Sequence, residues 1–298
     1  MYQILYAPGF NKFYRNLIKT VAPNWKWKSK IPVSGIVKLG TEKGTLLVET
    51  NPTSFATKHI FWSGMDQFEY IPIFKKMIPK FNSFVDIGAN TGIYSTLGCL
   101  FNPELKVLSF EPSVGPFEYL KRNIKNNHFE NRITPYQLAA SSEKGEAEFY
   151  EVSNLKYTYL KFNLGGVGNL AKKIAHRSME TNLVPTEMLD NLLAEKHPKF
   201  VPDLIKIDTE ATEDIVLRGM PKVITDHRPI FICETLYHRI EDNIEAIFAP
   251  HDYLFFNHVK DKNTLIQVNT LARETDNGVR DCFIVPKEKV ALIQEFVS

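Results

Sequence analysis

The chain has 298 residues, of which 44% are hydrophobic and 23% charged, and its net charge is +2. This composition is typical of a folded domain and excludes a disordered chain, and no apolar run approaches the ~18 residues of a membrane span. Pro8, Asn11 and Lys12 interrupt the first residues, so no signal-peptide core forms, and the three cysteines form no C-x-x-C pair. We therefore expect a cytoplasmic protein with one large core.

Residues 1–41 form a basic segment with seven Lys or Arg and no Asp or Glu, and aromatic residues are interleaved with the charges. The simpler interpretation is a basic helix whose aromatic side packs on its own domain. Peripheral contact with an anionic membrane surface, or with an acidic partner, is the alternative. Nucleic acid is not expected, because the basic stretch has no matching base-stacking motif elsewhere.

One large domain preceded by a smaller N-terminal part is predicted along the chain. Residues 1–80 combine the basic segment with a small cap, made of a β-hairpin at 35–49 and a helix-like stretch at 53–76. Residues 81–298 alternate between strands and helices, which predicts a mostly parallel sheet with covered faces. The predicted strands are 83–87, 106–111, 133–139, 204–208 and 229–234, and the predicted helices begin near Thr91 and cover 114–127 and 213–219. Strands at 253–259 and 282–285 would form an antiparallel hairpin that closes the sheet edge.

The turn after the first predicted strand indicates a nucleotide-like ligand. Asp86 precedes a turn with Gly88, Asn90 and Gly92, and the second strand ends in Glu111. Small residues let the backbone approach a ligand where a helix begins, and an acidic side chain can accept hydrogen bonds from ribose hydroxyls. A dinucleotide fingerprint requires G-x-G-x-x-G, and Asn90 replaces its second glycine. A carboxylate at Asp86 suits an ammonium group better than a phosphate, which favours S-adenosylmethionine.

A long insertion at about 148–202 separates the third and fourth strands, and it contains a glycine-rich run at 163–170. Insertions at this edge lie where ligands bind. The run lacks the Lys-Ser/Thr of a phosphate loop, so we predict a flexible substrate lid. The alternative is a simple surface turn.

Several motifs together resemble the FkbM family of S-adenosylmethionine-dependent methyltransferases, over about residues 45–287. They are 85–92 (VDIGANTG), 110–112 (FEP), 138–141 (LAAS), 163–166 (NLGG), 189–193 (LDNLL), 204–220 (LIKIDTEATEDIVLRGM) and 283–286 (FIVP), with a further similarity at 51–64. The family pattern Asp-x-Glu-Gly-x-Glu has Ala211 here in place of its glycine.

The resemblance implies an α/β, Rossmann-like class I methyltransferase fold and methylation of oxygen, often on a sugar or another secreted metabolite. It also implies cofactor contacts: Asp86 on the amino group, directly or through water, Asn90 on the carboxylate, and Glu111 on the ribose. Gly88 and Gly92 would allow close backbone approach, and Asp208 would lie beside the methionine part. The adenine pocket would be formed by Pro112, Ser113, Leu138 and Ala139.

Methylation of a hydroxyl benefits from a nearby base that takes its proton. Candidates at the carboxyl ends of the middle strands are Glu210 and His238, with Asp208 and Glu234 as further strand-end carboxylates. For His238 an exposed position at a helix start is the alternative. Asp208 and Glu234 could instead hold a divalent metal, as in catechol-type O-methyltransferases, but a metal is not favoured.

The sequence thus predicts an O-methyltransferase for a small-molecule or glycan acceptor, such as a sugar or a glycosylated metabolite. Two alternatives stay open. One is methylation of nitrogen in protein or nucleic acid, although the Asp/Asn-Pro-Pro-Tyr/Phe motif of base methylases is absent after the fourth strand. The other is a cofactor-binding scaffold without turnover, for which Ala211 is the only support.

Overall fold

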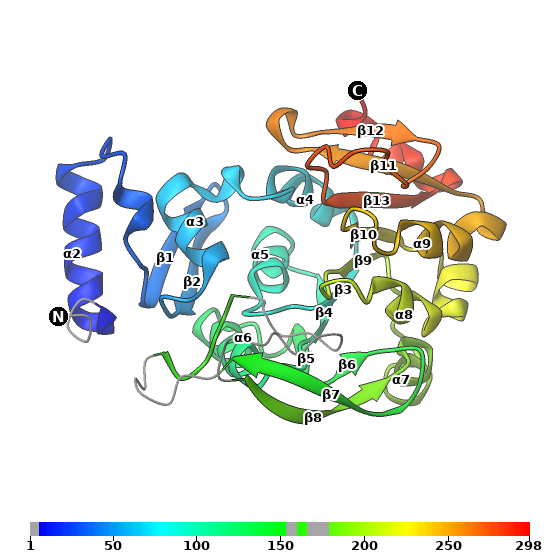
Figure 1. Ribbon diagram of the computed structural model, residues 1–298, viewed down its shortest axis with the longest axis horizontal. Helices are drawn as coiled ribbons and strands as arrows, with labels where there is room; N and C mark the ends of the chain where they lie inside the picture. The colour runs from blue at the N-terminus through cyan, green and yellow to red at the C-terminus, as the bar shows by residue number, and fades with distance from the viewer. Residues whose placement is uncertain (1–5, 153–159, 166–178) are drawn as a thin grey trace.

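An eight-stranded sheet forms the centre of the computed structural model, which describes residues 6–152, 160–165 and 179–298 (Figure 1). Its strand order is β12-β11-β13-β10-β9-β3-β4-β5. The strands are β3 (Ser83–Ile87), β4 (Lys106–Phe110), β5 (Ile133–Tyr136), β9 (Leu204–Ile207), β10 (Ile230–Glu234), β11 (Tyr253–Val259), β12 (Thr264–Val268) and β13 (Asp281–Pro286). The five strands from β5 to β10 are parallel, and β13, β11 and β12 add to them antiparallel. The predicted Rossmann-like α/β fold is confirmed.

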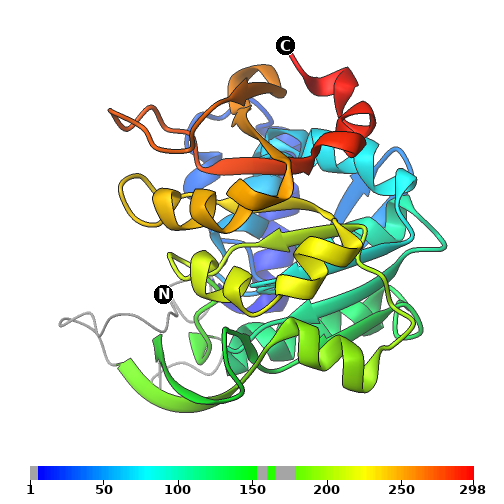
Figure 2. The ribbon, with the colours of Figure 1, turned by 90° about the vertical axis from the view of Figure 1, so that its right-hand side faces the viewer.

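Alternate residues of the central strands belong to two hydrophobic cores, one on each face of the sheet. On β3, Phe84 lies in the first core, whereas Val85 and Ile87 lie in the second. This alternation follows from the two-residue period of a strand. The first face is covered by α4 (Ile71–Met77), α5 (Ile93–Phe101) and α6 (Val114–Asn126), and the second by α7 (Leu189–Lys196), α8 (Glu213–Arg218) and α9 (Glu241–Phe248). Figure 2 shows the yellow helices in front of the sheet and the blue N-terminal elements behind it.

The N-terminal part contains α2 (Pro8–Val21), the hairpin of β1 (Gly35–Thr41) and β2 (Gly44–Thr50), and α3 (Phe55–Ser63). Its buried apolar side chains belong to the same core as Phe84 of β3. The prediction of one helix over 53–76 is wrong, because Gly64 adopts φ +99°, and the chain turns there before α4 begins. No helix in the described part of the chain is long and apolar enough to cross a bilayer.

Two predicted strand boundaries also differ. The stretch 133–139 divides into β5 of the main sheet and β6 (Ala139–Ala140) of a separate sheet with β7 (Gly145–Val152) and β8 (Met179–Glu187). At the carboxyl terminus β11 and β13 pair as predicted, but β12 lies outside β11 and forms the sheet edge. Part of the predicted lid is therefore regular structure, namely β8 and α7 together with the end of β7. The lid role itself stays a prediction.

Candidate active site

A cavity of about 340 Å³ lies at the carboxyl ends of β3, β4 and β9. The strand order reverses between β3 and β9, and ligands of open α/β sheets bind outside such a switch point. The cavity lining includes most of the residues predicted for the site: Gly88, Asn90, Glu111, Pro112, Ser113, Leu138, Ala139, Asp208 and Glu210. It does not include Asp86, Gly92, Glu234 or His238.

The turn after β3 has no room for a side chain at Gly88. Gly88 adopts φ +73°, and a Cβ there would lie 1.8 Å from the backbone oxygen of Asp208. The N–H groups of Gly88 and Ala89 both donate to the carbonyl of Phe110, at 3.0 and 2.9 Å. The turn is thereby fixed between the ends of β4 and β9. Gly92 has a structural task instead, because a Cβ there would lie 2.4 Å from Leu120 of α6.

Glu111 organises the edge of the cavity that begins at β4. Its two carboxylate oxygens accept hydrogen bonds from the N–H groups of Asn90, at 2.8 Å, and Ser113, at 2.9 Å. Burial raises the pKa of Glu111 to about 7, against the opposing effect of these hydrogen bonds. Each oxygen keeps a second lone pair, so the carboxylate can still accept hydroxyl donors from a ligand in the cavity.

Asp86 lies behind the cavity lining rather than in it. Its side chain is 1% exposed, and it accepts a hydrogen bond of 2.5 Å from the hydroxyl of Ser95. The ammonium of Lys206 on β9 is 3.7 Å from its other carboxylate oxygen. Burial raises the pKa of Asp86, and the charge of Lys206 opposes that rise. Direct contact between Asp86 and a ligand in the cavity is therefore not supported by this arrangement.

Lys206 is a site residue that the sequence interpretation missed. It is a single charged residue in the four-residue strand β9, which is otherwise apolar, and that contrast was the available signal. Its ammonium lies 3.1 Å from Asp208, which lines the cavity, and 3.4 Å from the carbonyl of Gly88. Lys206 thus connects the turn after β3, Asp86 and the end of β9.

Glu210 and Ala211 follow β9 in the left-handed region, with φ values of +59° and +75°. The positive φ explains why the family pattern has glycine where this chain has Ala211, since a Cβ is disfavoured in that conformation by about 1–2 kcal/mol. The strained turn presents Glu210 to the cavity. Glu210 is exposed to solvent, but desolvation by the surrounding protein atoms and the neighbouring charge of Asp208 raise its pKa.

Two further carboxyl groups lie close to Asp208 and Glu210 without lining the cavity. Glu213 is fully buried and accepts hydrogen bonds from the backbone N–H and the hydroxyl of Thr209, at 2.8 and 3.1 Å. Burial raises its pKa to about 7. Burial and the charges of Asp208, Glu210 and Glu213 raise the pKa of Glu234 to about 9. Glu210, Glu213 and Glu234 therefore hold their protons more tightly than isolated carboxyl groups do.

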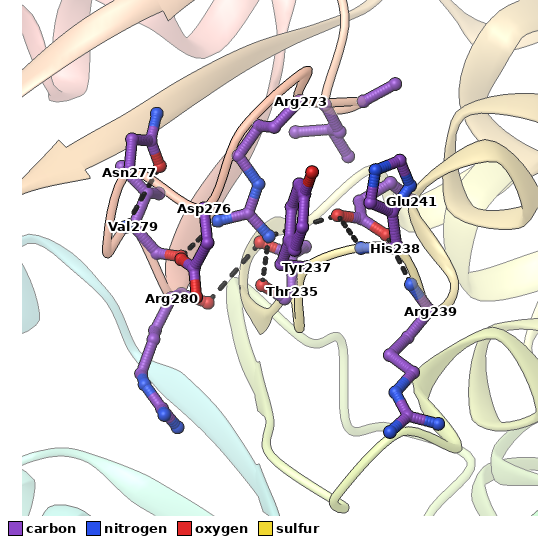
Figure 3. A network of polar contacts seen from close by, with 12 residues as sticks. Thr235, Tyr237, His238, Arg239, Glu241, Arg273, Asp276, Asn277, Val279 and Arg280 are labelled. Atoms are coloured by element: carbon purple, nitrogen blue, oxygen red, sulfur yellow. Dashed lines mark hydrogen bonds and ion pairs between the residues drawn. The ribbon is translucent and has the colours of Figure 1, made fainter.

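His238 lies in the loop between β10 and α9, and its side chain is exposed (Figure 3). The backbone N–H groups of His238 and Arg239 donate to the two carboxylate oxygens of Glu241, at 3.1 and 2.9 Å. Glu241 also pairs with Arg273 at 3.0 Å, and Arg273 donates to the carbonyl of Thr235 at 2.7 Å. This buried pair holds the loop in place, and it leaves His238 outside the cavity lining.

The small sheet supplies cavity residues that no sequence motif indicated. Phe149, Glu151 and Asn182 line the cavity. The carboxylate of Glu151 accepts hydrogen bonds from the N–H of Val114, at 2.8 Å, and from the side chain of Asn182, at 2.7 Å. Glu151 thereby joins the small sheet to the start of α6.

The described part of the predicted lid contacts the N-terminal part. Phe162 and Asn163 line the cavity, the carbonyl of Phe162 accepts from Asn51 at 2.8 Å, and the N–H of Leu164 donates to Thr53 at 2.8 Å. Residues 166–170 of the glycine-rich run lie outside the described residues. Within the described ranges, no group of three or more His, Cys, Asp or Glu side chains is placed to hold a metal ion.

Comparison with known proteins identifies a methyltransferase family. The model of the methyltransferase FkbM domain matches residues 86–259. The methyltransferase sdnD of Sordaria araneosa is 27% identical over 169 residues, which are 48% of this chain and 62% of that protein.

Two solved structures show more distant similarity. Methyltransferase FkbM from Methylobacillus flagellatus KT is 16% identical, with a TM-score of 0.44 over 77% of this chain and 53% of that one. Precorrin-6y C5,15-methyltransferase from Geobacter metallireducens GS-15 is 9% identical, with a TM-score of 0.39 over 73% of this chain and 87% of that one. The family model covers more than half of the chain, which therefore belongs to the FkbM family of methyltransferases.

Proposed function

We propose that this enzyme is an S-adenosylmethionine-dependent O-methyltransferase that methylates a hydroxyl of a sugar, a glycan or a glycosylated metabolite. Membership of the FkbM family makes it a methyltransferase and in general implies use of this cofactor. The observation that carries the finer proposal is the composition of the cavity. A site suited to a nucleoside lies on its β4 side, and two carboxylates, Asp208 and Glu210, lie on its β9 side.

The residues on the β4 side fit the nucleoside part of the cofactor. Glu111 has free lone pairs for ribose hydroxyls, and its position is fixed by the N–H groups of Asn90 and Ser113. Leu138 and Ala139 add apolar surface that suits an adenine ring. Gly88 approaches Asp208 closely where the ends of β3 and β9 meet. The cavity wall at this point is therefore formed by backbone rather than by a side chain.

When bound, the cofactor supplies a methyl group on a sulfonium, and an acceptor oxygen displaces the sulfur as the C–O bond forms and the C–S bond breaks. The proton of the acceptor hydroxyl must leave, and we assign it to Glu210. A base works best when its pKa lies near the working pH, and desolvation together with Asp208 moves the pKa of Glu210 in that direction. Lys206 pairs with Asp208 at 3.1 Å, which places an ion pair beside the base.

The preference for a hydroxyl-rich acceptor rests on the polar groups around Glu210. Asp208, Thr209 and Thr212 line the same end of the cavity. Carboxylates and hydroxyls accept or donate hydrogen bonds to several sugar hydroxyls at once, and unmatched polar groups would disfavour an apolar acceptor.

Titration calorimetry with S-adenosylmethionine and S-adenosylhomocysteine tests the cofactor assignment. We expect binding by the wild type, and weaker binding by Glu111→Gln by about 1–3 kcal/mol, the contribution of hydrogen bonds to a charged group. No binding, or tighter binding of NAD, would contradict the cofactor site.

Transfer of a labelled methyl group then tests the acceptor class. The enzyme should label glycans or glycosylated metabolites from cell extracts. It should label neither protein nor nucleic acid. Incorporation into protein or nucleic acid alone would establish the nitrogen alternative. Cofactor binding with no transfer to any fraction would favour a non-catalytic scaffold.

We also propose a reducing compartment such as the cytoplasm. Cys233 and Cys282 are opposite each other on the paired strands β10 and β13, and both are buried free thiols. Free thiols at such close positions are expected where glutathione keeps cysteines reduced. Thiol labelling of the protein as isolated, under denaturing conditions, would check this.

A further inference from the structure

Helix α2 has one face that is tied to the protein and another that is exposed. On the inner face Asn11 donates to the carbonyl of Pro32 at 2.8 Å, and Arg15 donates to the carbonyl of Ile36 at 2.8 Å and to that of Ser34. Asn11 and Arg15 are buried. These contacts fix the rotation of the helix about its axis, so the opposite face is held toward solvent.

The exposed face of α2 carries a stripe of large apolar side chains. Phe10, Phe13, Leu17 and Val21 are spaced three to four residues apart, which places them on one side of a helix. Phe13 and Val21 are 66% and 67% exposed, and Phe10 and Leu17 are 44% and 48% exposed. This stripe therefore lacks a covering element among the described residues, and Figure 1 shows α2 at the outer end of the molecule, beside β1.

The apolar surface continues beyond the helix. Trp25 and Trp27 are 46% and 56% exposed, and they alternate with Lys26, Lys28 and Lys30. The ammonium of Lys30 lies 3.8 Å from the centroid of the Trp27 ring. We call the exposed stripe of α2 together with residues 25–30 the N-terminal surface.

Charge decides what could cover the N-terminal surface. Residues 1–41 contain seven Lys or Arg and no Asp or Glu, whereas the rest of the chain has a net charge of about −5. A second copy that paired through this same surface would place lysines against lysines, with no carboxylate from this segment to neutralise them. An anionic surface has the complementary charge, and tryptophan and lysine are the residue types found at membrane interfaces.

We propose that the N-terminal surface docks on an anionic membrane, with α2 lying in the plane of the interface. Phe13, Leu17 and Val21 then enter the boundary between headgroups and acyl chains, and Lys26, Lys28 and Lys30 contact the headgroups. This attachment is peripheral. It is independent of the methyl transfer reaction and of the cavity, because none of these residues lines the cavity.

Co-sedimentation of the full chain with vesicles tests the proposal. Binding to vesicles that contain phosphatidylserine should exceed binding to pure phosphatidylcholine by about 10-fold or more, and added salt should weaken it. Changing Lys26, Lys28 and Lys30 together to Gln should reduce the anionic preference by a similar factor. Changing Phe13, Leu17 and Val21 together to Ser should remove binding both to vesicles that contain phosphatidylserine and to vesicles of pure phosphatidylcholine.

The matched control changes three exposed apolar residues elsewhere, Leu183, Val201 and Ile266, together to Ser. This variant should bind vesicles as the wild type does. Circular dichroism of each variant shows whether the fold is retained. Failure of the folded wild type to bind anionic vesicles would overturn the proposal, and so would binding that the Phe13, Leu17 and Val21 changes leave intact. A dimer in light scattering that those changes dissociate would overturn it in favour of a second copy.

Discussion

The ammonium nitrogen of Lys206 lies 3.1 Å from a carboxylate oxygen of Asp208, where β9 ends at the cavity. Both residues project from one side of the strand, and Asp86 of the adjacent β3 lies opposite Lys206 in the strand register. Burial lowers the pKa of Lys206, but the charges of Asp208, Asp86 and Glu69 more than offset this, and its pKa is raised overall. Lys206 is therefore a charged group inside the sheet, balanced by carboxylates.

Replacing Lys206 with Met should destabilise the fold by about 3–5 kcal/mol, because Asp86 would remain buried without its cation. Urea unfolding followed by circular dichroism measures the change. The double variant Asp86→Asn, Lys206→Met removes both charges and should recover part of the loss. Equal stability of the single variant and the wild type would show that the pair is not important for folding.

Gly88→Ala should disrupt the turn after β3, because the added Cβ would overlap the backbone oxygen of Asp208 at 1.8 Å. We expect the free energy of unfolding to fall by more than about 3 kcal/mol, or the variant to fail to fold, because the backbone cannot move aside as a side chain can. Gly278→Ala is the matched control. Gly278 has a φ of +76°, close to the +73° of Gly88, but no atom lies within 4 Å of the added Cβ. Its loss should be only about 1 kcal/mol, from backbone strain, and similar losses in both variants would refute the steric explanation.

Glu210→Gln should lower kcat by about 10²-fold or more with nearly unchanged cofactor affinity, because only the transition state uses the proton transfer. His238→Gln should retain the wild-type rate, since that side chain does not line the cavity. Steady-state kinetics with a glycan acceptor and calorimetry with the cofactor separate the two effects. Loss of rate in the His238 variant, with an active Glu210 variant, would reverse the assignment.

Stability should fall as the pH rises from about 4.5 to about 7, in part because of Glu213. Burial raises the pKa of this group from 4.5 to about 7, so the folded state binds its proton more tightly than the unfolded state does across that window. The contribution of Glu213 to the free energy of unfolding is fully present below this pH window and is lost above it. The loss amounts to about 1–3 kcal/mol. Urea unfolding at about pH 5 and about pH 8 measures the difference.

Glu213→Gln should reduce this pH dependence, because the amide does not titrate. Glu111 and Glu69 also have pKa values raised to about 7, so a smaller slope of the same sign should remain. Glu130→Gln, a change at an exposed carboxylate, should leave the slope as in the wild type. An unchanged slope in the Glu213 variant would show that its proton is not taken up on folding.

Local sequence patterns are sufficient to locate the sheet and the turn that opens the cavity. Buried strands are short apolar runs, so β3, β4, β9 and β10 could be located from local pattern alone. Gly88 and Glu111 were identifiable because each obeys a local rule: a turn needs a residue that tolerates positive φ, and a strand end presents its last side chain at the ligand edge. The same holds for Asp208 and Glu210, whose lining of the cavity follows from their place after β9.

Which of the polar residues face the cavity depends instead on packing between distant segments of the chain. Asp86 and Asp208 both lie near the carboxyl ends of adjacent strands, but Asp86 is buried against Ser95 and Lys206, whereas Asp208 lines the cavity. Glu151 and Asn182 reach the cavity because β7 and β8 fold back beside α6, a contact between segments distant in sequence. His238 is held outside by Glu241 and Arg273. Such outcomes depend on long-range packing and on the energetic requirement that buried charges find partners, neither of which a local pattern contains.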